Sequence, residues 1–175
     1  FYSGRLDFDP DTSTDIKTPL YSQEVFISKY DSNGTYLWTK TFGGTGFANV
    51  NDVHYSNGYL YMCGQYSDSV DFDPDTIGRA MEYASNDDVF VLKLDSNANF
   101  EWVKTFGGPS LDVGQEITTD LQGNVYTAGE FRGRVDFDPG SNNQFIGSSG
   151  SEDVFIQRLN SNGNFVWVNK YIGYN

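Results

Sequence analysis

One block of sequence occurs almost three times along this chain of 175 residues. EVFISKYDSNGTYLWTKTFGG returns as DVFVLKLDSNANFEWVKTFGG and as DVFIQRLNSNGNFVWVNKYIG, at positions 24–44, 88–108 and 153–173. A shorter motif, LDFDP or VDFDP, stands at 6–10, 70–74 and 135–139. Trp102 follows Trp38 by 64 residues, and Trp167 follows Trp102 by 65. A long repeat made of short strands is typical of propellers and solenoids, so the repeat predicts the architecture before any single residue is considered.

Each repeat predicts four antiparallel strands. DVFVLKLD alternates in the period of two that strands show, and the SNG or SNAN that follows supplies tight-turn residues. We therefore expect an all-β fold, a β-propeller segment of about two and a half four-stranded blades with a repeat of about 64 residues. The outer half of one blade covers 1–44, a full blade covers 45–108 and another covers 109–175. Because a propeller ring needs at least about four blades, we expect further blades of the same polypeptide or further subunits.

Charge and composition limit the classes of partner that the chain can bind. Asp and Glu number 24 against 11 Lys and Arg, a formal net charge of −13, which repels phosphate backbones and argues against nucleic acid. The same acidity suits divalent cations, or serves only solubility. Cys63 is the sole cysteine, so no disulfide can form within the chain, and its alignment with Ala128 predicts a small buried strand position. No segment is apolar enough to predict membrane insertion.

The repeat unit resembles a known family. The succession DVFVLKLDSNANFEWVKTFGG, QEITTDLQGNVYTAGEF and VDFDP is similar to the SBBP-type β-propeller repeat. That repeat occurs in secreted and cell-surface bacterial proteins, often cargo of type IX secretion. The resemblance implies an extracellular, bacterial cell-surface location and a propeller that is one module of a longer polypeptide. It implies no catalytic residues.

The DFDP motifs are the candidate metal sites. Their carboxylates recur at alternate positions, so in an extended loop they can point one way and offer hard oxygen ligands to calcium, the one cofactor expected. The alternative is an Asp-Pro turn whose carboxylates accept hydrogen bonds from backbone N–H groups. The third copy has Gly140 in place of its last Asp and should bind calcium less well. The candidate ligands are Asp7, Asp9, Asp11, Asp71, Asp73, Asp75, Asp136 and Asp138.

The predicted topology places the DFDP loops beside the loops at 43–51 and 107–115, on one acidic face. Propellers commonly bind ligands on such a face, so we take it as the expected interaction surface, against the alternative of a merely solvated face. The three tryptophans share one register, which favours packing between blades over a sugar-stacking platform.

Catalysis finds little support in the residues. His54 is the only histidine, and no Ser or Cys nucleophile has a marked base. We therefore expect no enzyme but a non-catalytic extracellular scaffold or recognition module that binds a protein or glycan through the acidic face. Two alternatives stay open: a carboxylate-based glycan hydrolase, and a component or cargo of a bacterial secretion or surface-adhesion assembly.

Overall fold

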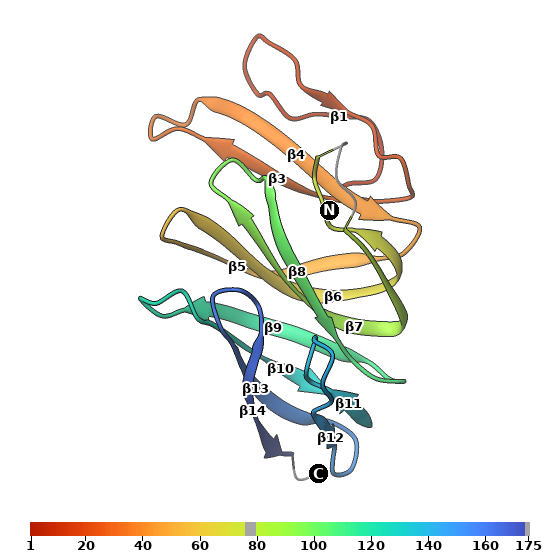
Figure 1. The fold of residues 1–175 in the computed structure, drawn as a ribbon. Helices are drawn as coiled ribbons and strands as arrows, with labels where there is room; N and C mark the ends of the chain where they lie inside the picture. The colour runs from red at the N-terminus through yellow and green to blue at the C-terminus, as the bar shows by residue number, and fades with distance from the viewer. Residues whose placement is uncertain (76–79, 174–175) are drawn as a thin grey trace.

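The computed structural model describes residues 1–75 and 80–173, and over these residues the chain is all-β. Antiparallel sheets are stacked one above another along the molecule, from the N-terminal hairpin of β1 to the C-terminal strands (Figure 1). The expected fold class, an all-β propeller segment, is confirmed. The described residues contain no helix of the length and apolar character needed to cross a membrane.

The last sheet is a complete four-stranded blade, which we name the third blade. Its strands are hydrogen-bonded in the order β14-β13-β10-β9. The order therefore follows the chain from the innermost strand to the outermost, as the repeat predicts for a blade. The strands are β9 (Asp112–Thr119), β10 (Val125–Phe131), β13 (Asp153–Leu159) and β14 (Phe165–Ile172).

The middle of the chain forms the second blade, from β5 (Ala48–Ser56), β6 (Tyr59–Asp71), β7 (Met81–Asp95) and β8 (Phe100–Phe106). Two earlier strands, β3 (Glu24–Tyr30) and β4 (Tyr36–Gly44), form the outer part of the first blade. The first two blades are not separate sheets. Gly43 and Gly44 at the end of β4 pair with Asp71 and Val70 at the end of β6, which joins both into one hydrogen-bonded sheet.

The segment between the second and third strands of each blade carries a small hairpin that the sequence reading treated as a loop. It is β1 (Leu6–Asp7) with β2 (Ile16–Lys17) in the first blade and β11 (Arg134–Asp136) with β12 (Phe145–Gly147) in the third. In the second blade the same hairpin consists of the extended ends of β6 and β7, paired from Asp68↔Ala84 to Asp71↔Met81. The alternation in these stretches is too short to stand out beside the turn residues.

The hydrophobic core lies between blades. One cluster joins the first blade to the second through Val25, Phe42 and Phe90, and the other joins the second to the third through Val89, Phe106 and Phe155. Trp38 and Trp102 are half-buried against these clusters, consistent with packing between blades. Cys63 is fully buried as expected, and burial raises the pKa of its thiol to about 12.

Candidate functional site

The DFDP carboxylates bind the backbone of their own turns. Asp71 Oδ1 accepts hydrogen bonds from the N–H groups of Asp73 (3.2 Å) and Ala80 (2.8 Å), and Asp73 Oδ1 accepts one from Asp75 N–H (2.9 Å). An Asp side chain that accepts from the residue two positions later forms an Asx turn. This is the geometry of the turn alternative.

The other two copies repeat this arrangement. In the first copy, Asp7 Oδ1 accepts from the N–H groups of Asp9 and Asp15, and Asp9 Oδ1 accepts from that of Asp11. In the third copy, Asp136 Oδ1 accepts from the N–H groups of Asp138 and Gln144, and Asp138 Oδ1 accepts from that of Gly140. Asp75 also pairs with Lys40 at 2.9 Å. Within residues 1–75 and 80–173, no three His, Cys, Asp or Glu side chains gather in a group that could hold a metal ion. Calcium at these loops stays a prediction.

The phenylalanine of DFDP has a role that the sequence reading missed. The ring of Phe72 lies 5.8 Å from Phe42 on the outer strand of the preceding blade, and 5.3 Å and 4.9 Å from Tyr66 and Phe90 of its own blade. Aromatic pairs at such centroid distances add to the free energy gained by burying their area. The phenylalanine of the motif therefore packs its own blade against the blade before it.

The next junction is built in the same way. Phe137 lies 5.4 Å from Phe106 of the second blade and 5.2 Å from both Phe131 and Phe155 of the third. A backbone bridge between Gly107 and Asp136 accompanies it. The signal for this role was present in the sequence, because an apolar residue between two repeated acids has no reason to recur unless it is buried.

An acidic notch opens at the junction of the second and third blades. It is a cavity of about 300 Å³, and we use the name for the side chains of Asp88, Asp136, Asp138, Tyr66 and Tyr83 that line it. Gly107 lines the same cavity, so the DFDP loop of the third blade and the loop that begins at Gly107 do meet, as the topology predicted. No Lys or Arg is among the described residues lining the notch.

Asp88, which the sequence reading did not single out, is the unusual group of the notch. Its Oδ1 atom is buried without a hydrogen-bond partner. Burial raises the pKa of Asp88 to about 7, with a further contribution from the charges of Asp112 and Asp87. Burial also raises the pKa of Asp112 to about 6, although the N–H groups of Gly108 and Arg132 donate hydrogen bonds to its carboxylate.

The counterparts of Asp88 in the other repeats are satisfied. Glu24 accepts a hydrogen bond from the Tyr2 hydroxyl (3.1 Å) and another from Leu20 N–H (2.9 Å). Asp153 accepts from Ser149 N–H at 2.7 Å and pairs with Lys170 at 3.2 Å. An unpaired buried carboxylate is costly, so the notch at the junction of the second and third blades is chemically distinct from its repeat equivalents.

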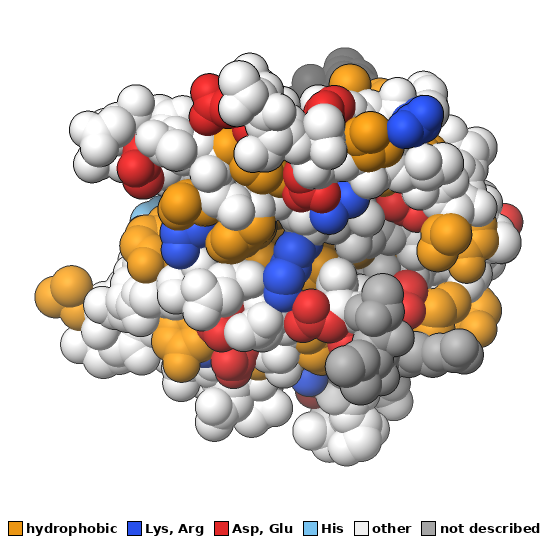
Figure 2. Space-filling view, turned by 90° about the horizontal axis from the view of Figure 1, so that it is seen from above, with side chains coloured by type: hydrophobic (Ala, Val, Ile, Leu, Met, Phe, Trp, Pro, Cys, Tyr) orange, Lys and Arg blue, Asp and Glu red, His pale blue; other side chains and the backbone are white. Residues whose placement is uncertain are grey.

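Positive and negative side chains are mixed on the face at the β1 end of the molecule. Figure 2 looks down on the β1 end of the stack and shows Lys and Arg side chains beside Asp and Glu, with hydrophobic side chains between them. Lys17 pairs with Asp15 at 2.8 Å in the β1–β2 hairpin region. The described residues lining the notch, by contrast, include the carboxylates of Asp88, Asp136 and Asp138 and no Lys or Arg.

Part of the chain is similar to a known repeat family. The model of the SBBP β-propeller repeat matches residues 101–130, from β8 through β10. An uncharacterized WD repeat-containing protein of Acanthamoeba polyphaga mimivirus is 24% identical over 162 residues, 83% of this chain and 11% of that protein. The regulatory protein FlaEY of Caulobacter vibrioides is 25% identical over 173 residues, 93% of this chain and 18% of that protein. The chain thus spans less than a fifth of the length of these relatives. Residues 101–130 are thus similar to an SBBP-type β-propeller repeat, which agrees with the all-β blades of the structure.

Proposed function

We propose that this chain is a non-catalytic propeller scaffold that binds a protein partner, outside the cell, by taking a basic side chain into the acidic notch. The coarse function, a repeat scaffold or interaction module, agrees with the SBBP repeat and with the WD-repeat relative. The observation that carries the finer proposal is the notch, where Asp88, Asp136 and Asp138 line one cavity without a cation among its described lining.

The chemistry of the notch favours a protein over a glycan. Arginine presents a planar fork of donors that pairs with carboxylates, and it is enriched at binding hot spots. Asp88, Asp136 and Asp138 line the notch, and such a fork can pair with carboxylates there. Tyr83 is 74% exposed beside it, and an exposed tyrosine can stack on a guanidinium group. The extracellular location rests only on the resemblance to repeats of secreted bacterial proteins.

The test is a titration of the ¹⁵N-labelled chain with the blocked peptide acetyl-Gly-Arg-Gly-amide, followed by amide chemical shifts. We expect the largest changes at Asp88, Gly107 and Asp136. The double variant Asp136→Asn/Asp138→Asn should lose them. Asp120→Asn is the matched control, because Asp120 caps the turn between β9 and β10, at the opposite end of β10. Asn160 already accepts the same i+4 N–H hydrogen bond in the turn between β13 and β14.

Two results would contradict the proposal. One is a set of small shifts spread over all acidic loops, which indicates general charge attraction only. The other is a localised change at the notch produced by a neutral oligosaccharide such as xylohexaose and not by the arginine peptide. In that case the ligand is a glycan.

A glycan hydrolase is the second candidate, because of the raised pKa of Asp88. A general acid needs a carboxyl that is protonated near neutral pH beside a second carboxylate, and Asp88 lies in one cavity with Asp136 and Asp138. Hydrolysis of a panel of chromogenic glycosides by the chain, lost in Asp88→Asn, would replace the scaffold proposal. Release of no product from any substrate leaves the scaffold as the function.

A further inference from the structure

The strand β3 has an open edge that its counterparts lack. β3 pairs along its length with β4 on one side. On the other side its only described partner is Tyr2, which exchanges both backbone hydrogen bonds with Glu24, at 2.9 and 3.1 Å. In the second and third blades the equivalent strands β7 and β13 are paired along this edge with β6 and β10. An unpaired edge offers N–H and C=O groups to another strand.

The Tyr2↔Glu24 bridge is the first rung of the ladder that the sister blades complete. Its equivalents are Tyr66↔Asp88 in the second blade and Phe131↔Asp153 in the third. Backbone groups alternate in direction along a strand. The N–H groups of Phe26 and Ser28 therefore face the same open side as that of Glu24.

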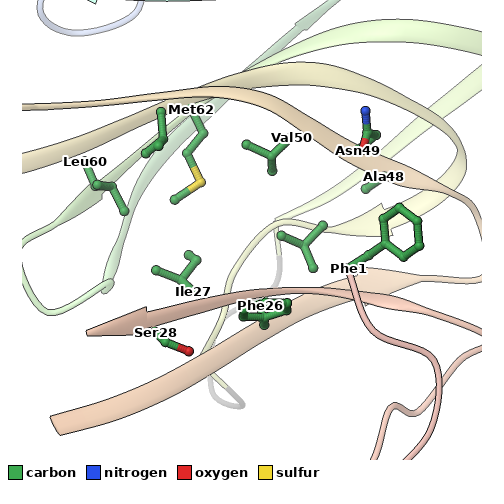
Figure 3. A pocket seen from close by; sticks show the side chains of 11 residues that line it. Phe1, Phe26, Ile27, Ser28, Ala48, Asn49, Val50, Leu60 and Met62 are labelled. Carbon is green, nitrogen blue, oxygen red and sulfur yellow. The ribbon is translucent and has the colours of Figure 1, made fainter. Parts of the chain in front are cut away.

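A cavity of about 370 Å³ lies along this edge. It is lined by Val25 and Ile27 of β3, by Phe1, and by the residues of β5 and β6 that face them. Ile27, Val50, Leu60 and Met62 lie around the space between β3 and the β5–β6 pair (Figure 3). The lining is mostly apolar, so an occupant would gain free energy by covering it.

Side chains at the junction of the first and second blades are more exposed than their counterparts at the next junction. Val53, on the inner strand of the second blade, is 54% exposed, whereas its repeat counterpart Ile117 is only 5% exposed. Ile117 belongs to one buried cluster with Tyr61 and Cys63, both contributed by β6 of the blade before it. The cavity beside Val53 therefore lies where the first blade would contribute an aromatic and a small side chain from a strand equivalent to β6.

We propose that the groove beside β3 accepts an antiparallel β-strand from another repeat of this type, supplied from outside residues 1–175. The register of the sister blades assigns its residues. The position opposite Tyr30 is apolar, Tyr lies opposite Lys29, a small residue opposite Ile27, and Gly opposite Phe26. The pattern is that of Leu60–Gly64 and Val125–Gly129.

The glycine at the end of this pattern has a steric reason. A Cβ atom built on Gly129 would lie 2.0 Å from Val113 O of the inner strand and 2.8 Å from the ring of Phe155. One built on Gly64 would lie 1.8 Å from Asn49 O of the inner strand and 3.0 Å from the ring of Phe90. Phe26 occupies the same register as these two rings. A side chain opposite Phe26 would therefore push its ring away.

A second copy of this chain is a poor source of the strand. Its own β6 and β10 are each hydrogen-bonded on both sides, to β5 and β7 and to β9 and β13. Releasing either one would unfold a blade. A free strand of another repeat incurs no such cost. The groove is also separate from the acidic notch, since none of the residues lining it is shared.

The experiment adds the peptide acetyl-Asn-Val-Tyr-Thr-Ala-Gly-amide, copied from residues 124–129, to the chain of residues 1–175. Backbone amide exchange is followed by NMR. We expect exchange at Phe26 and Ser28 to slow about tenfold at a peptide concentration of about ten times Kd, because binding multiplies protection by one plus the ratio of ligand concentration to Kd. The methyl signals of Val53 and Leu60 should shift together with them.

Two control peptides distinguish specific binding in the groove from nonspecific pairing with an open strand edge. Replacing the terminal Gly by Leu should weaken binding through Phe26, and replacing Tyr by Ser should weaken it through the cavity. β14 is an internal control, because its outer edge is also unpaired in the described structure and none of its residues lines the groove. Equal protection of β14 and β3, or equal binding of all three peptides, would overturn the proposal. So would concentration-dependent protection of Phe26 without peptide, which would make a second copy the occupant.

Discussion

Replacing Asp88 by Asn should make the protein more stable at pH 8. Asp88 Oδ1 is buried without a hydrogen-bond partner, and the neighbouring carboxylates of Asp112 and Asp87 repel its charge. The amide of Asn is nearly the same size and carries no charge. The substitution thus removes the repulsion and leaves the packing against Gly107 almost unchanged.

The magnitude follows from the raised pKa. The folded-state pKa is about 7, against 3.8 for an ordinary aspartate. Since one pKa unit corresponds to about 1.4 kcal/mol, keeping Asp88 ionised in the folded state at pH 8 costs at most about 4 kcal/mol. Asp88 is only partly buried, so solvent screening should reduce the gain to about 2 kcal/mol.

The sign of the pH dependence follows from linkage. A carboxyl with a raised folded-state pKa binds more protons in the folded protein, so its penalty is absent below about pH 4 and grows until about pH 7. Urea unfolding of wild type and Asp88→Asn at pH 4 and pH 8 measures it, with Asp11→Asn as an exposed control of the same chemistry. A difference between the two proteins that is equal at both pH values would refute the reasoning.

Further predictions concern the phenylalanine of DFDP, the glycine at position 129, calcium at the DFDP loops and the thiol of Cys63. Phe72→Ala should lower the free energy of unfolding by about 3–5 kcal/mol in urea. Phe8→Ala should cost less, because the aromatic rings paired with Phe8 in the described structure, Tyr2 and Phe26, both belong to the first blade. Gly129→Val should abolish cooperative unfolding seen by circular dichroism, since a Cβ there lies 2.0 Å from Val113 O. If calcium binds the DFDP loops, calorimetric titration should show heat that Asp73→Asn reduces, and a titration without heat would remove that prediction. Cys63 should react with a thiol reagent only in denaturant, because burial raises its pKa to about 12, and rapid labelling of folded protein would contradict its position.

Much of the architecture followed from local sequence. The 64-residue repeat, the alternation in 88–95 and the turn residues after it predict strands and their order in a blade, because strand period and turn chemistry depend on neighbouring residues. The Asp-Pro turn could also be predicted from the sequence, since Asp71 and Asp73 accept hydrogen bonds from N–H groups two residues away. Such contacts form within one segment and need no knowledge of what packs against it.

The features that matter for function depend on contacts between blades, which only the tertiary structure decided. Glu24, Asp88 and Asp153 occupy one register and look equivalent in the sequence, yet only Asp88 has a buried oxygen without a partner. Val53 and Ile117 are likewise equivalent by repeat, but one faces an open groove and the other a filled core. A repeat specifies the same strand each time. The desolvation of a carboxylate and the filling of a cavity depend instead on the atoms that a neighbouring blade brings within a few ångströms, and those neighbours differ along the chain.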